Sequence, residues 1–142
     1  MENKKLKRQQ EIKLTISDLA FGGRGISKLD DLVFFVKDAI PNQEVIARIS
    51  KIKKKYVEAY SVETVKESKD QVGPLCEHFK WCGGCTTQQL DYQKQLHFKQ
   101  KQISDILNKI AGEKDLDINP IIGCEQTFFY RNKMEYTFSG VP

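Results

Sequence analysis

The sequence lacks the features of a membrane-spanning or exported chain. Its longest unbroken apolar run is Leu32 to Val36, whereas a transmembrane helix needs about 20 apolar residues. The first residues are polar and include no apolar stretch of the kind found in secretory signals. We therefore expect a cytoplasmic protein without a membrane partner, and its 39% hydrophobic and 30% charged residues are typical of a globular chain.

Recognisable catalytic motifs are also missing. The 142 residues include only 2 histidines, with no His-Glu-x-x-His and no Gly-x-Ser-x-Gly segment. The glycine-rich stretch from Gly22 to Gly25 has neither the phosphate-loop pattern nor the spacing of a dinucleotide-binding loop. The sequence by itself therefore assigns no catalytic residue and no residue that binds an organic cofactor.

The first half of the chain has the pattern of short strands. Ile12, Leu14 and Ile16 alternate with polar residues, which is the period of a half-buried strand. About five short strands with turn residues between them predict a small antiparallel barrel of the OB type at residues 11–67, after a basic lead-in at 1–10. The other expected strands include 32–36, 45–52 and 56–65.

A second region, residues 68–112, follows a polar stretch that ends at Gly73-Pro74. It contains a cysteine-rich segment and then one long helix over 87–111, for which Thr86 and Gln89 match a capping box and Gly112 a C-terminal stop. The apolar face of this helix is expected to consist of Tyr92, Leu96, Ile103, Ile106, Leu107 and Ile110. Residues 113–142 are expected to be extended, with a strand at 133–138 that lacks a visible partner, as in a fragment of a larger protein.

The cysteines form a candidate metal site. Cys76, Cys82 and Cys85 lie close together, with Gly83 and Gly84 between the last two. In a reducing compartment such clusters bind metal more often than they form disulfides, and thiolates suit either zinc or an iron–sulfur cluster. A closed site needs a fourth ligand, for which Cys124 and, with zinc, His78 are the candidates. Each of these residues also has an ordinary interpretation without a metal. The clustered cysteines would be small buried residues, His78 a polar loop histidine and Cys124 a free thiol.

The basic residues are clustered although the net charge is only +4. This charge permits a nucleic-acid partner without requiring one. A hairpin tip is expected at Lys51, Lys53, Lys54 and Lys55, beside Tyr56 and Tyr60. It is either a solvated turn or a surface that follows a nucleic-acid backbone and stacks a base.

Three further cationic residues each have a structural and a functional interpretation. Arg24 either belongs to a plain barrel turn or contacts a phosphate. Arg131 and Lys133 follow the aromatic stretch 128–130. They either flank the core of a strand or contact RNA.

The cysteine segment resembles a known family. Pro74-x-Cys76-x5-Cys82-Gly-Gly-Cys85, followed by Gln88-x-Leu90-x-Tyr92-x-x-Gln95-Leu-x-x-Lys99, is similar to the iron–sulfur segment of the RNA uracil-5-methyltransferases. These S-adenosylmethionine-dependent enzymes make 5-methyluridine in ribosomal or transfer RNA. Residues 12–65 resemble the family's TRAM domain, an OB-like RNA-binding barrel. Tyr130 to Met134 resembles the start of its central RNA-binding domain.

The resemblance implies ligands for a [4Fe–4S] cluster. Cys76, Cys82 and Cys85 match three cluster ligands of the family, whose fourth cysteine normally follows the Tyr-Arg-Asn-Lys segment. Cys124 precedes that segment, so it does not occupy the matching position and is only a substitute candidate. The resemblance also makes Arg24, the lysine tip, Arg131 and Lys133 the expected RNA contacts.

The resemblance also sets the expected function. The family's cofactor loop, its cysteine nucleophile segment and its glutamate base do not occur in these 142 residues. We expect the N-terminal region of a 23S-ribosomal-RNA-type enzyme, a monomer that binds RNA but is inactive alone, with S-adenosylmethionine bound only by the full-length parent. The alternatives are a stand-alone TRAM-type RNA-binding protein with a structural zinc and, more weakly, a cysteine redox enzyme.

Overall fold

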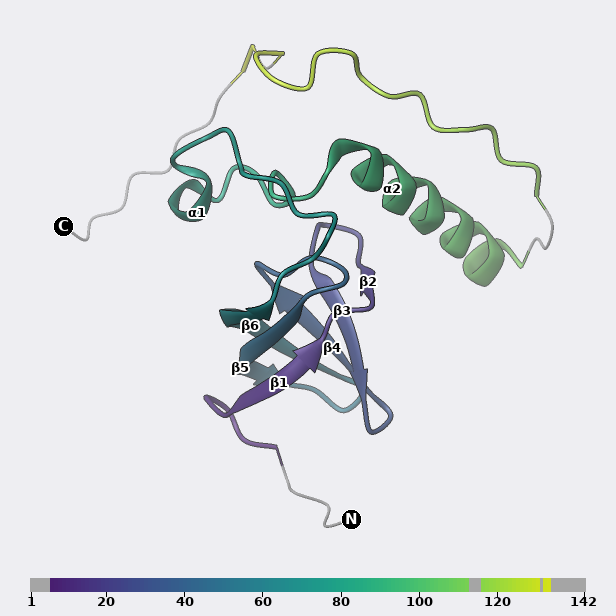
Figure 1. Ribbon diagram of the computed structural model, residues 1–142. Coiled ribbons are helices and arrows are strands. Elements are labelled where there is room, and N and C mark those ends of the chain that lie inside the picture. The colour runs from purple at the N-terminus through teal and green to yellow at the C-terminus, as the bar shows by residue number, and fades with distance from the viewer. Residues whose placement is uncertain (1–5, 113–115, 131, 134–142) are drawn as a thin grey trace.

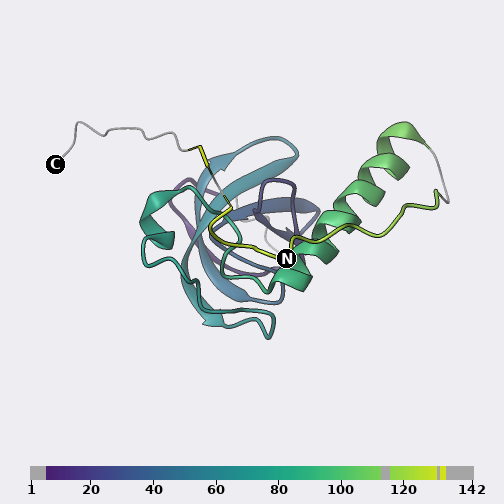
Figure 2. The same cartoon turned by 90° about the horizontal axis from the view of Figure 1, so that it is seen from above.

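The computed structural model describes residues 6–112, 116–130 and 132–133. In these ranges one six-stranded sheet has the strand order β1-β5-β6-β4-β3-β2. The sheet curls so that β1 also contacts β3, which gives the barrel shape in Figures 1 and 2. The expected mainly β region followed by one long helix is therefore confirmed. The strands are β1 (Glu11–Thr15), β2 (Asp18–Leu19), β3 (Gly25–Leu29), β4 (Leu32–Lys37), β5 (Glu44–Ile52) and β6 (Tyr56–Lys66).

Alternate residues of the strands fill the inside of the curled sheet. Val36, Val45 and Val57 have 0% of their surface exposed, although they come from three different strands. Since successive side chains of a strand point to opposite faces, the residues between them point outward. The buried cluster contains Leu14, Ile16, Phe34, Val36, Ala39, Val45, Ala47, Ile49, Val57 and Ala59.

Strand β3 was not expected from the sequence. Its buried side is formed by Gly25 and Ser27 rather than by large apolar residues, so the usual alternation is absent. A Cβ on Gly25 would lie 2.8 Å from Ile16 Cγ2, which shows how closely β3 packs on the core. The turn expected at Asp30-Asp31 is confirmed, and both residues have positive φ, 46° and 62°, as in the tight turns that join hairpins.

The expected all-antiparallel pairing is wrong at one ladder. β4 and β6 run parallel, with Val33 opposite Tyr56 and Lys37 opposite Tyr60. The chain leaves β4 and enters β5, which is not its neighbour in the sheet, and β6 then returns between the two. Residues 38–43 form the crossing, and Asp38 and Asn42 adopt positive φ there.

The cysteine segment is a loop whose two ends are held together. Gln71 and Leu90 form an isolated antiparallel bridge, and the Val72 N–H donates to the Gln89 carbonyl over 2.9 Å. Between these ends lies the short helix α1 (Phe79–Cys82). The loop is therefore closed at its base beside the barrel.

The long helix starts later than expected. α2 spans Tyr92–Ile106, and a π-helical turn, η1 (Leu107–Ala111), continues it to Gly112, whose φ of 69° confirms the expected stop. The predicted Thr86 cap is wrong, because the side chain of Asp91 accepts the cap hydrogen bond from the Lys94 N–H over 3.2 Å. Leu90 is buried against the barrel, which holds the preceding residues in turns rather than in a helix.

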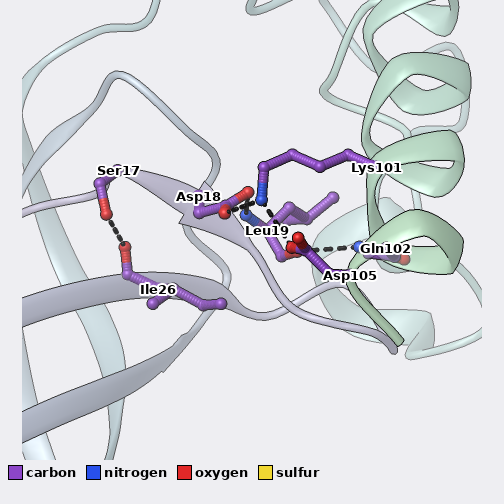
Figure 3. Close-up of polar contacts among 7 residues, drawn as sticks. All are labelled: Ser17, Asp18, Leu19, Ile26, Lys101, Gln102 and Asp105. Atoms are coloured by element: carbon purple, nitrogen blue, oxygen red, sulfur yellow. Dashed lines mark hydrogen bonds and ion pairs between the residues drawn. The ribbon is translucent and has the colours of Figure 1, made fainter. Parts of the chain in front are cut away.

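α2 packs on the barrel through a small apolar cluster and a polar contact. Phe98 of α2 and Leu90 lie against Leu19 and Ile40 of the barrel. Lys101 of α2 contacts β2 beside them (Figure 3). The apolar face predicted for the helix is packed only in part, since Ile103, Ile106 and Ile110 are 45%, 40% and 81% exposed.

The chain after η1 runs back along the helix. Gln100 donates to the Asn119 carbonyl over 3.1 Å, and Gly123 lies beside Leu96 (Figure 1). Its described part is extended without strand pairing. The strand expected at 133–138 lies, apart from Lys133, outside the described residues. Among the helices described, none is long and apolar enough to cross a membrane.

Candidate nucleic-acid interface and cysteine loop

Three of the four lysines expected at a hairpin tip, Lys53, Lys54 and Lys55, form the turn between β5 and β6, and Lys51 lies at the end of β5 next to it. The Lys53 N–H donates to the Tyr56 carbonyl over 2.9 Å, which closes the turn between β5 and β6. Lys51, Lys53, Lys54 and Lys55 are all exposed. Within the described ranges, no ion pair involves any of them, so four positive charges face solvent at one end of the barrel.

Arg24 belongs to a tight loop between β2 and β3. The Ala20 N–H donates to the Arg24 carbonyl over 2.7 Å, and Gly23, with a φ of 82°, lies against Thr86 of the cysteine loop. The two glycines beside Arg24 therefore serve packing, as the barrel-turn interpretation expected. The Arg24 side chain is 52% exposed, and its guanidinium lies 3.9 Å from the Glu58 carboxylate of β6. Because Glu58 is opposite Lys51 in the β5–β6 ladder, Arg24 points to the same outer face as the lysine tip.

The outer face of β5, β6 and β4 also carries residues that the sequence interpretation missed. The rings of Phe35 and Tyr56 meet edge to face, with centroids 5.6 Å apart. The guanidinium of Arg48 lies 5.9 Å from the centre of the Tyr60 ring and donates to the Tyr60 hydroxyl over 3.3 Å. The sequence signal for Arg48 is its position between the apolar Ala47 and Ile49, whereas the unbroken apolar run 32–36 gives no such signal for Phe35.

Arg48 is held in place by two partners. Its guanidinium donates to the Glu11 carboxylate over 2.7 Å and 3.1 Å. These bonds, followed by the one to Tyr60, raise the pKa of Arg48 above its usual value. The residue is therefore a fixed cation next to an aromatic ring at any pH of interest.

Hydrogen bonds order the backbone of the cysteine loop, but its thiols are not brought together. The Cys76 N–H donates to Gln88 Oε1 over 2.8 Å, and the Cys82 N–H to the His78 carbonyl over 2.8 Å. Gly83 has a φ of 66°, which ends α1 in the left-handed region that suits glycine. Cys76, Cys82 and Cys85 are free and exposed. Over the described ranges, no three His, Cys, Asp or Glu side chains are close enough to hold a metal ion.

The two candidates for a fourth ligand have other partners. The Cys124 N–H donates to the Tyr92 hydroxyl over 2.7 Å, and its thiol donates to the Gln126 carbonyl over 3.0 Å. The exposed His78 lies 3.8 Å from Glu77. None of these three contacts involves Cys76, Cys82 or Cys85.

The last candidate contacts are described only in part. Lys133 is exposed, whereas Arg131 lies outside the described residues. Phe129 is 97% exposed and Tyr130 67%. In the described segment, these two aromatic residues therefore do not form the core of a strand.

Comparison with known proteins finds a domain family for the barrel residues and relatives for most of the chain. The TRAM domain family matches residues 5–62. A Bacteroides thetaiotaomicron protein named "Uncharacterized RNA methyltransferase" is 42% identical over 85% of this chain and 27% of its own length. A Porphyromonas gingivalis protein of the same name is 37% identical over 89% of this chain and 27% of its own length. The chain thus spans about 27% of the length of these curated relatives.

One solved structure is also similar. It is the Pyrococcus abyssi tRNA (uracil-54, C5)-methyltransferase in complex with S-adenosyl-L-homocysteine. It is 29% identical, with a TM-score of 0.45 over 68% of this chain and 21% of that one.

Proposed function

Because the chain belongs to the RNA methyltransferases that carry a TRAM domain, we propose that it is the RNA-binding N-terminal region of a uracil-C5 methyltransferase of the ribosomal RNA type. Its own task is to bind RNA and to position it for a catalytic domain. The observation that carries this proposal is the exposed four-lysine tip on a TRAM barrel. Lysines without carboxylate partners bind phosphates at little cost, because no existing ion pair has to be broken.

The chemistry of the whole enzyme lies outside these residues. Bound S-adenosylmethionine would supply the methyl group for C5 of a uracil to which a cysteine thiolate has added at C6. The segments that would supply the thiolate and the base do not occur in the 142 residues. The role that remains for this chain is to hold RNA through Arg24 and the lysine tip, with Arg131 and Lys133 as further contacts.

The cysteine loop is proposed to hold a [4Fe–4S] cluster through Cys76, Cys82 and Cys85. The donor set supports this, since three exposed thiols lie on one short loop whose ends are closed by the Gln71–Leu90 bridge. A short closed loop costs little entropy when its residues are gathered around a metal centre. The cluster would order the loop next to the RNA-binding barrel, and zinc is the competing occupant.

The RNA-binding proposal is tested by titrating the chain with RNA at several salt concentrations. Replacing Lys53, Lys54 and Lys55 by Glu should weaken binding to all RNA sequences and make the salt dependence shallower. Each phosphate contact that is lost removes about 0.7 to 0.9 from the slope of log affinity against log salt. A control in which Lys66, Lys99 and Lys109 are replaced by Glu makes the same change in net charge at exposed sites elsewhere.

Two outcomes would contradict the proposed function. Equal loss in the two triple variants would mean that only net charge matters and that the tip is a solvated hairpin. Formation of 5-methyluridine by the chain alone, with S-adenosylmethionine and RNA supplied, would show that the catalytic groups lie within it.

A further inference from the structure

The outer face of the barrel carries aromatic side chains at positions where a solvent-facing sheet usually carries polar ones. Tyr56 and Tyr60 flank the buried Val57 and Ala59 in β6, so both tyrosine rings lie outside the core. Phe35 likewise lies between buried neighbours in β4 and contacts Tyr56 edge to face. All three residues are only half-buried, so none of them is enclosed in the core.

The charges around these rings are unevenly distributed. Arg24 pairs with Glu58, Arg48 with Glu11 and Lys37 with Asp38, so these six charges offset one another. The excess positive charge is at Lys51 and at Lys53, Lys54 and Lys55, directly before Tyr56. An anion is therefore attracted to the end of the face at which the first ring lies.

The spacing suits an extended polymer. Tyr60 is four residues beyond Tyr56 on the same strand, which is about 13 Å at the rise of a strand. Arg48 fixes the Tyr60 ring from one side, and Lys37 lies opposite Tyr60 on the other strand. An extended polymer bound at the lysine tip would thus meet Tyr56 and then Tyr60, each with cations nearby.

We propose that this face binds single-stranded RNA, with phosphates at the lysine tip and bases stacked on Tyr56, supported by Phe35, and on Tyr60. The inference rests on the proposed RNA-binding function and adds the form of the RNA and the groups that recognise it. Aromatic rings stack on any base, so this contact is tolerant of sequence. A duplex keeps its bases paired inside the helix, so it can use the lysines but not the rings.

The test uses the whole chain, a fluorescent single-stranded oligoribonucleotide that cannot pair with itself, and the same strand annealed to its complement. Tyr56→Leu should weaken single-strand binding about tenfold, since one stacked base contributes a substantial part of the affinity. Its salt slope should be unchanged because no phosphate contact is removed. Tyr56→Phe should bind like the parent, and Tyr56→Leu should leave duplex binding unchanged.

A second measurement reports base stacking directly and is made only with variants that melt at the temperature of the parent chain. Placing 2-aminopurine at successive positions of the strand reports stacking through loss of its fluorescence. Quenching by the parent chain and by Tyr56→Phe, but not by Tyr56→Leu of equal melting temperature, is the expected result.

The outcomes separate this inference from the function on which it rests. Parent-like binding and quenching by Tyr56→Leu, with loss in the lysine triple variant, would overturn the stacking face and leave RNA binding intact. Equal weakening of single-strand and duplex binding by Tyr56→Leu would also overturn it. Absence of any RNA binding by the parent would remove the proposed function and this inference together.

Discussion

Lys101 of α2 donates a hydrogen bond of 2.6 Å to the carboxylate of Asp18 in β2, 83 residues earlier in the chain. The same ammonium group donates to Asp105 over 2.9 Å, and Gln102 donates to the Leu19 carbonyl over 2.8 Å (Figure 3). These contacts lie beside the apolar cluster of Leu19, Ile40 and Leu90, against which Phe98 packs. The polar contacts fix the direction in which the helix leaves the barrel, whereas the apolar cluster supplies most of the attraction.

The first prediction concerns the Asp18–Lys101 ion pair. Asp18→Asn should lower the free energy of unfolding by at most about 0.5 to 1 kcal/mol, because exposed ion pairs are well solvated. The side chains of Lys101 and Asp18 are 41% and 27% exposed. Denaturant unfolding measures the change. Asp38→Asn is the control, because its partner Lys37 lies 3.9 Å away and both side chains are about 70% exposed. If Asp38→Asn lowered the free energy of unfolding as much as Asp18→Asn, the Asp18–Lys101 ion pair would not stabilise the protein specifically.

The second prediction is the pH dependence of the contacts that Lys101 makes with Asp18 and Asp105. The hydrogen bond from Lys101 lowers the pKa of Asp105 below its usual 3.8, so its contribution is present above that pH and is lost as the pH falls through the lowered value. The hydrogen bond to Asp18 raises the pKa of Lys101 above 10.5, so its contribution is present below 10.5 and is lost at higher pH. Stability attributable to this contact should therefore be flat between about pH 5 and pH 9. In Asp105→Asn, the stability that is lost as the pH falls should be smaller than in the parent chain, as measured by melting temperature against pH. If the melting temperature of this variant fell with acid as steeply as that of the parent, the prediction would be wrong.

The third prediction tests the close packing of β3. Gly25→Ala would place a Cβ 2.8 Å from Ile16 Cγ2 and 2.9 Å from the Ala39 carbonyl oxygen. Overpacking of this kind typically costs about 1 to 3 kcal/mol. Gly73→Ala is the matched control, because nothing lies within 4 Å of the added Cβ. Thermal unfolding of the two variants compares them, and equal melting temperatures would mean that the backbone at residue 25 relaxes freely.

Much of the barrel could be predicted because its strands carry a strong period-two signal. Ile12 to Ile16, most of β5 and the first half of β6 alternate between buried and outward residues, and the lysine tip is a clear turn. β3 was missed because Gly25 and Ser27 replace large apolar residues on its buried side. The parallel β4–β6 ladder was missed because local patterns do not encode which strands become neighbours.

The start of the helix and the outer aromatic face needed the tertiary structure. A capping box at Thr86 satisfies local rules, but the burial of Leu90 beside Leu19 and Ile40 delays the helix to Asp91. Phe35 was expected as part of an unbroken apolar strand, which hides which of its residues point outward. Only the ladder with β6 shows that its ring meets Tyr56.

The last prediction concerns the proposed metal centre. Anaerobic reconstitution with iron and sulfide should give a brown protein, because thiolates bound to iron absorb visible light. Cys82→Ser should abolish the colour, since it removes one of the three proposed ligands on the loop. Cys124→Ser should retain most of it, because that thiol already donates to the Gln126 carbonyl and its backbone is held by Tyr92. The two serine variants thus form a matched pair, with metal analysis and absorption as the readouts.

The same experiment distinguishes the competing ligand sets. Aerobic protein should contain little metal, because a cluster with three protein thiolates leaves one iron open to solvent and oxidants. Loss of all iron in Cys124→Ser would make Cys124 the fourth ligand and would require residues 124–126 to rearrange. Stoichiometric zinc without iron after anaerobic preparation would contradict the cluster. It would favour a zinc site instead, in which three thiolates and the exposed His78 could complete a tetrahedron, and His78→Ala would then release the metal.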